Sequence, residues 1–162
     1  VLNAAAEKAG WGKPLPAGVH RGIAQFMGYG SYSAAVAEVS VSPRGELKVH
    51  RLVLALNCGH AVNPDQIAAQ VEGSVAYGLT AALYGELTVE KGRIVEDNFH
   101  TYKIMRLAEM PKVETVIVPT YDFWGGVGEP TICVVTPSVL NAIAAATGKP
   151  VRSLPLKNVK LV

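Results

Sequence analysis

The spacing of hydrophobic positions predicts an antiparallel meander of strands in the first half of the chain. Side chains from Ser33 to Ser42 alternate with a period of two, which is typical of a half-buried strand. The run from Leu47 to Leu56 begins with the same alternation and ends in a continuous apolar stretch, as expected for a strand that passes from a sheet edge into a core. A turn at Ser42-Pro43-Arg44-Gly45 joins these strands, and residues 21–30 are expected to form a third.

Two longer segments have the hydrophobic spacing of helices. From Pro64 to about Tyr84, apolar residues recur at every fourth position, and Asn63 can cap the helix. This stripe is expected to pack on the sheet, and it consists of Ile67, Val71, Val75, Leu79 and Leu83. A second helix near the C-terminus is expected to begin with Thr136 as its cap and to end at Gly148. We expect a further strand from Lys112 to Val118.

These elements predict an α+β fold, mainly an antiparallel sheet packed against two long helices. The chain has 162 residues, of which 49% are hydrophobic and 17% charged, so it is long enough to bury one sizeable core. Residues 1–18 are interpreted as a helix end followed by a linker rich in glycine and proline. Residues 19–162 are interpreted as one domain.

Charge and cysteine content argue against several kinds of partner and site. The net charge is +2 and the basic residues are scattered, so nucleic-acid binding is not expected. The longest uncharged stretch, Thr131 to Gly148, contains a proline and an asparagine, which argues against a membrane span. Cys58 and Cys133 form no Cys-x-x-Cys pair, and the four histidines lack metal-ligand spacing. Any metal is therefore expected to be held by a cofactor or by other protein, and no metal ligand is assigned in this chain.

The loop Gly125-Gly126-Val127-Gly128-Glu129-Pro130 is the strongest candidate for chemistry. Pro130 disfavours helical backbone angles at Glu129, and the three glycines widen the conformations open to the loop. Few basic residues precede this loop and an apolar run follows it, so we expect the Glu129 carboxylate to be desolvated and to act as a general base. Spacing alone leaves a solvent-exposed turn glutamate as the alternative.

Gln70, Gly73, Ser74 and Tyr77 share one face of the first predicted helix, beside its apolar stripe. A glycine at position 73 costs about 1 kcal/mol of helix stability relative to alanine, which suggests that another group comes close there. The amide of Gln70 offers a donor and an acceptor beside this gap. Packing of the helix against a strand is the alternative. His60 has no adjacent acid or nucleophile, so it is assigned no role.

Short motifs along nearly the whole chain carry a family resemblance. They are Ala37-Glu38-Val39, Asn57-Cys58-Gly59, Val62-Asn63-Pro64, Gln70-Val71-Glu72-Gly73, Gly78-Leu79, Asn98-Phe99, Gly126-Val127-Gly128-Glu129-Pro130, Asn141-Ala142-Ile143, Ala146-Thr147-Gly148 and Leu154-Pro155. Together they resemble the molybdenum-binding large subunits of xanthine oxidase-family hydroxylases, particularly the isoquinoline 1-oxidoreductase beta-subunit type.

This resemblance implies roles for four residues. It implies that Glu129 lies beside the molybdenum and removes a proton from a metal-bound hydroxyl, and that Gln70 lies near the molybdopterin. Gly73 and Gly128, which belong to the same two motifs, are assigned to cofactor binding with Gln70. The reaction implied is oxidation of an aromatic N-heterocycle or an aldehyde with oxygen derived from water.

The resemblance also implies cofactors and partners. Molybdopterin with molybdenum is expected, as the cytosine dinucleotide, and is held largely by segments outside this chain. The [2Fe-2S] clusters are expected on a partner subunit, because the two cysteines here cannot hold one. The expected partners are the N-terminal remainder of the molybdenum subunit, an iron–sulfur small subunit and a small-molecule substrate.

The length of the chain is compatible with two hypotheses about its function. The molybdenum subunits of that family are several times longer, so we expect a fragment of a molybdenum-cofactor-binding domain that is inactive alone. The alternative is a stand-alone α+β domain of the same fold that binds no cofactor and serves as a structural or interaction module. The intact loop from Gly125 to Pro130 favours the first hypothesis, since a structural module has little physical reason to keep its acid.

Overall fold

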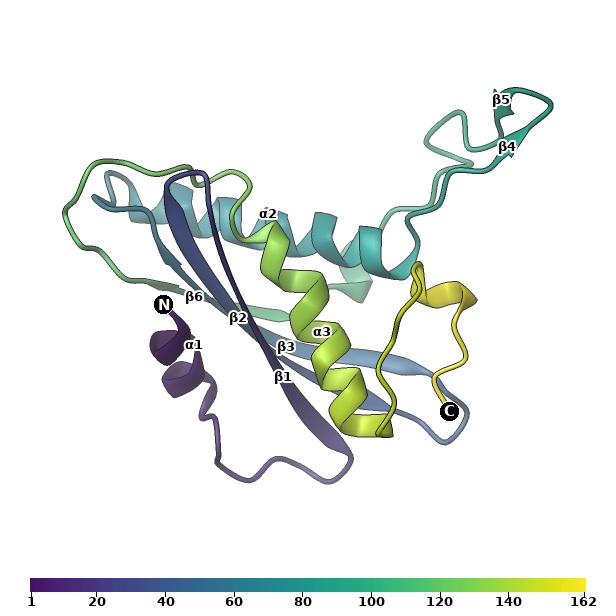
Figure 1. Ribbon diagram of the computed structural model, residues 1–162, viewed down its shortest axis with the longest axis horizontal. Helices are drawn as coiled ribbons and strands as arrows, with labels where there is room; N and C mark the ends of the chain where they lie inside the picture. Colours follow the sequence, from purple (N-terminus) through teal and green to yellow (C-terminus); the bar gives the residue numbers. More distant parts are fainter.

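The computed structural model describes residues 1–162 as a four-stranded sheet covered by three helices (Figure 1). The helices are α1 (Leu2–Ala9), α2 (Pro64–Leu83) and α3 (Ile132–Thr147). The strands are β1 (Val19–Gly28), β2 (Ser31–Val41), β3 (Leu47–Asn57) and β6 (Lys112–Ile117), in the order β1-β2-β3-β6. β1 and β3 pair with β2 in antiparallel fashion, whereas β6 is parallel to β3. The predicted α+β class with a mainly antiparallel sheet is confirmed.

Helices cover both faces of the sheet. The strand predicted over residues 33–42 is confirmed, but the expectation that only one of its faces is buried is wrong for its first half. On one face, α2 and α3 enclose the larger core together with the apolar half of β3. On the other face, α1 packs Ala5 and Ala9 against small apolar side chains of β2 and β3, namely Ala34, Val36, Val53 and Ala55. As a result β2 is buried on both sides from Ser33 to Ala37. Alternation in the sequence could not reveal this second layer, because the alanines that form it also fit an exposed face.

A row of charged side chains crosses the sheet near the end of α1. Glu38 on β2 lies 2.9 Å from Arg21 on β1 and 3.4 Å from Arg51 on β3, and Arg51 donates to Glu114 on β6 at 2.9 Å. The hydrogen bond from Arg51 is the main reason why the pKa of Glu114 falls to about 2. Both arginines also donate to backbone carbonyls between residues 8 and 13. The charged row therefore ties α1 and the segment after it to the sheet, while a division of the chain at residue 18 stays a prediction.

α2 has the bounds and the buried face that its sequence predicts. The Asn63 side chain accepts a hydrogen bond from the Gln66 backbone N–H at 3.2 Å, and Pro64 is the first helical residue. The predicted stripe is buried, apart from the half-buried Leu83. It packs mainly against α3 and β6. The cap and the four-residue repeat were sufficient to define this helix.

α3 begins earlier than predicted. Thr131 is its N-cap residue and Ile132 its first residue, so Thr136 is not a cap and Pro137 lies inside the helix. An interior proline removes one backbone hydrogen bond, so something must offset its cost. The buried side chains of the first turns, Val134 and Val135, provide that compensation by joining the core. Packing against the core therefore outweighs the local preference for a helix that starts at Thr136 and Pro137.

Residues 85–111 connect α2 to β6 and include a hairpin that projects away from the sheet (Figure 1). Its strands are β4 (Val89–Glu90) and β5 (Arg93–Ile94), joined by a turn at Lys91-Gly92 where both residues have positive φ. Two short 3₁₀ turns complete the fold, η1 (Leu107–Glu109) and η2 (Leu156–Asn158). None of the helices has the length and apolarity that crossing a membrane requires.

Candidate functional site

Two buried serines at the start of β2 anchor the loop from Gly125 to Pro130. Ser31 Oγ donates to the carbonyl of Gly126 at 2.7 Å, and Ser33 Oγ donates to the carbonyl of Pro130 at 2.8 Å. Both serines are fully buried. The loop is thus held near both of its ends by hydrogen bonds from buried hydroxyl groups, which restricts where the intervening Glu129 can lie.

The first half of this loop also contacts two other turns. Gly125 N–H donates to the carbonyl of Cys58 at 3.0 Å, and Gly126 N–H donates to the carbonyl of Tyr29 at 2.7 Å. A β-carbon at Gly125 would overlap the carbonyl of Gly30 and the hydroxyl of Ser31. Glycine is therefore required at position 125 because the loop passes so close to the turn between β1 and β2.

Glu129 is exposed to solvent, so the desolvated environment expected from the sequence is not present within this chain. Its carbonyl accepts a hydrogen bond from Ile132 N–H at 3.1 Å, which fixes its backbone at the entrance to α3. The apolar run that follows Glu129 forms the first turns of α3, where Val134 and Val135 face the core and not the carboxylate. The apolar residues that follow Glu129 in the sequence therefore do not surround its carboxylate in the structure.

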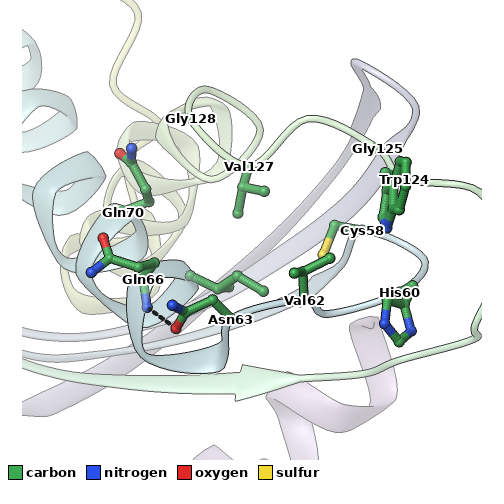
Figure 2. A pocket seen from close by; sticks show the side chains of 11 residues that line it. Cys58, His60, Val62, Asn63, Gln66, Gln70, Trp124, Gly125, Val127 and Gly128 are labelled. Carbon is green, nitrogen blue, oxygen red and sulfur yellow. Dashed lines mark hydrogen bonds between the residues drawn. The ribbon is translucent and has the colours of Figure 1, made fainter.

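A pocket of about 410 Å³ opens beside the loop (Figure 2). Its lining comes from three segments: Cys58, His60 and Val62 after β3; Asn63, Gln66, Ile67 and Gln70 at the start of α2; and Trp124, Gly125, Val127 and Gly128 in the loop. None of these residues is Asp, Glu, Lys or Arg. The pocket brings two of the four predicted site residues together, Gln70 and Gly128. Glu129 directly follows Gly128 but is not among the lining residues, and neither is Gly73.

No atom of this chain comes close to Gly73, so the close approach expected there stays a prediction for a group outside the chain. Gly73 is exposed, and a β-carbon there would meet no atom within 4 Å. The close approach on α2 occurs at Gly78, where a β-carbon would lie 2.7 Å from Val135 Cβ of α3. A β-carbon on Gly128 would also meet nothing within 4 Å. Gly73 and Gly128 therefore leave space that the chain itself does not use.

The sequence analysis assigned no role to two polar residues of the pocket, His60 and Gln66. Gln66 could have been found, because it lies one helical turn before Gln70 on the same face. His60 and Trp124 line the same pocket only because the two segments that contain them run side by side, with His60 N–H donating to the carbonyl of Asp122 at 3.2 Å. Because this hydrogen bond joins residues about sixty positions apart, no local sequence pattern predicts it.

The residues of this chain do not form a metal-binding cluster. No group of three or more His, Cys, Asp or Glu side chains is placed so that it could hold a metal ion. Cys58 is buried and Cys133 is half-buried, and both are free thiols. The polar groups that the pocket offers to a ligand are amides, an imidazole and loop backbone.

Comparison with known proteins gives the family. Residues 8–111 match the molybdopterin cofactor-binding domain family. The beta subunit of isoquinoline 1-oxidoreductase from Brevundimonas diminuta is 33% identical over 162 residues, which cover 97% of this chain and 21% of that protein. The aldehyde oxidoreductase molybdenum-binding subunit PaoC of Escherichia coli is 32% identical over 141 residues, which cover 82% of this chain and 19% of that protein. The chain thus spans about a fifth of the length of these relatives.

Solved structures agree with this assignment. The aldehyde oxidoreductase from Desulfovibrio gigas superposes with a TM-score of 0.66 at 25% identity, covering 78% of this chain and 15% of that chain. Quinoline 2-oxidoreductase from Pseudomonas putida 86 shares the fold with a TM-score of 0.71 at 18% identity, covering 78% of this chain and 17% of that chain. The chain therefore belongs to the molybdopterin cofactor-binding domain family and corresponds to part of a molybdenum-binding subunit of the xanthine oxidase type.

Proposed function

We propose that this chain is part of the catalytic subunit of a molybdenum hydroxylase and contributes Glu129 as the general base. The substrate class is an aromatic N-heterocycle or an aldehyde, and the oxygen introduced comes from water. The observation that carries the proposal is the anchored loop. Hydrogen bonds from the buried serines Ser31 and Ser33 hold its backbone, while the Glu129 side chain is exposed and can meet a ligand. A carboxylate on a fixed backbone next to a pocket is suited to proton transfer.

The residues present fit a molybdopterin held partly by this chain. Gly128 and Gly73 leave open space where side chains would stand, as a cofactor that passes close to the backbone requires. Gln70 lines the pocket and offers an amide edge, which can both donate to and accept from a pterin ring. Since no side-chain cluster here could hold a metal ion, the metal would be carried by the pterin. We propose the cytosine dinucleotide form, held mostly by the rest of the subunit.

When bound, the molybdenum–pterin group supplies the oxygen transfer and accepts the electrons removed from the substrate. The chain's own contribution is position and proton transfer. Gln70 would hold an edge of the cofactor from the first turns of α2, and Gly128 would let the loop backbone approach it. A carboxylate oxygen of Glu129 would accept the proton of the water-derived hydroxyl whose oxygen enters the substrate. The rest of the subunit would cover Glu129 and exclude water from the reacting atoms.

Two partners complete the proposed enzyme. The remainder of the molybdenum-binding subunit supplies most of the cofactor contacts, in keeping with the length of the relatives. A separate iron–sulfur subunit or domain carries [2Fe-2S] clusters and removes the electrons, because this chain has only two cysteines.

The proposal is tested by assembling the chain with the rest of its subunit and comparing Glu129→Gln with the native protein. Loss of a general base is expected to lower kcat by about 10²–10⁴-fold while molybdenum content stays the same. Glu90→Gln, an exposed change in the projecting hairpin, is the matched control and should leave kcat unaltered. Oxidation of isoquinoline or benzaldehyde that survives Glu129→Gln would refute the base. A stable complex without molybdenum would instead favour the structural-module hypothesis.

A further inference from the structure

The two ends of the pocket differ in chemistry. Gln66 and Gln70 lie at one end and form the amide end, whereas Trp124, Cys58 and His60 lie at the other and form the aromatic end (Figure 2). The amide end matches the cofactor edge in the proposed function. The aromatic end has no counterpart in that proposal, although it is part of the same cavity.

Backbone contacts fix the position of Trp124. On one side of it, the carbonyl of Asp122 accepts a hydrogen bond from His60 N–H at 3.2 Å, and on the other, Gly125 N–H donates to the carbonyl of Cys58 at 3.0 Å. Gly59, with a φ of 77°, allows this close pairing, because a β-carbon there would overlap the carbonyl of Phe123. The backbone of Trp124 is thus fixed where its side chain forms one wall of the pocket, although 60% of the residue is exposed.

The wall suits an uncharged flat ring. Indole presents the largest aromatic face among the amino acids, and flat rings stack on it with a preference beyond their buried area. No Asp, Glu, Lys or Arg lines the pocket, so a phosphate or carboxylate would find no charged partner there. The side chain of Val62 adds an apolar surface, and the His60 imidazole can donate to or accept from a ring heteroatom.

We propose that the aromatic end of the pocket is a subsite for a flat, uncharged aromatic ring, which stacks on the Trp124 indole. This inference rests on the proposed function and deepens it. One ligand chemistry, a planar heteroaromatic ring, has two possible sources: the heterocyclic substrate or the nucleobase of the pterin dinucleotide. In either case Trp124 selects rings over saturated groups of similar size.

The test uses the chain assembled with the rest of its subunit and carrying Glu129→Gln, so that bound isoquinoline is not consumed. Isoquinoline binding is measured by titration calorimetry, and the pterin nucleotide released on denaturation is quantified. Trp124→Ala is expected to weaken isoquinoline binding about tenfold if the ring is the substrate, or to lower the retained nucleotide about tenfold if it is the nucleobase. Trp124→Phe, which keeps a flat ring, should recover most of the loss.

Trp11→Ala is the matched control, since Trp11 carries the same side chain, is 47% exposed and does not line the pocket. Either expected loss, with Trp11→Ala unaffected, supports the subsite and identifies the source of the ring. Unchanged isoquinoline binding and unchanged nucleotide content in Trp124→Ala would overturn it, and so would equal losses in Trp11→Ala. Isoquinoline oxidation by the Glu129→Gln complex would contradict the proposed base instead, so the two failures are distinguishable.

Discussion

Two glycines of the same helix should respond to alanine in opposite directions. Gly73 and Gly78 both lie inside α2, where a glycine costs about 1 kcal/mol relative to alanine. At Gly73 an added methyl group would meet no atom within 4 Å, so the full gain is expected. Gly73→Ala should therefore raise Tm by about 2–4 °C for a chain of this size.

At Gly78 the same change creates a steric conflict. The new β-carbon would lie 2.7 Å from Val135 Cβ and 2.9 Å from its Cγ1, well inside the contact distance of about 3.5–4.0 Å between carbon atoms. Val135 is fully buried and β-branched, so it cannot rotate away easily. Separating α2 from α3 costs about 1–3 kcal/mol, which outweighs the helix-propensity gain of about 1 kcal/mol. Gly78→Ala should lower Tm.

Thermal unfolding followed by circular dichroism, with urea unfolding as a second method, measures both effects on the 162-residue chain. The reasoning would be refuted if the two variants shifted Tm in the same direction by similar amounts. The proposed function adds one consequence: in the assembled subunit, Gly73→Ala should reduce cofactor retention even though it stabilises the chain. Retention equal to that of the native protein would contradict the assignment of Gly73 to the cofactor.

Three further changes test the loop anchor and the charged row. Ser33→Ala leaves the carbonyl of Pro130 without its buried 2.8 Å hydrogen bond, and should destabilise the chain by about 1–3 kcal/mol in urea unfolding, while the exposed control Ser153→Ala should have no measurable effect. Thr131→Val should be neutral or stabilising, because the buried Thr131 hydroxyl has no hydrogen-bond partner; a clear loss of stability would reveal one. Glu114→Gln should lower Tm at neutral pH, and its difference from the native chain should narrow as pH falls. The pKa of Glu114 lies near 2 in the folded chain and at 4.5 ordinarily, so its stabilising effect is complete above 4.5 and is lost as pH falls toward 2. A difference in Tm that stays constant over that range would show that the carboxylate charge is not responsible.

The sequence by itself determined the elements whose signals are local. The cap at Asn63 and the four-residue apolar repeat define α2, and alternation with the turn between them predicts β2 and β3. The glycine-rich loop could also be recognised, since Pro130 and the glycines act on the backbone nearest to them. The family motifs carried the resemblance that the comparisons then confirmed.

Tertiary structure alone decided the properties that depend on distant neighbours. α3 begins at Ile132 because burial of Val134 and Val135 against the core outweighs the stop signal of Pro137. Glu129 is exposed because the apolar residues after it turn into that core. Gly78, and not Gly73, is the close contact because only the position of α3 distinguishes them. The pocket joins His60 to Trp124 through a pairing between segments about sixty residues apart. Packing energies depend on which surfaces meet, and a one-dimensional pattern does not contain that information.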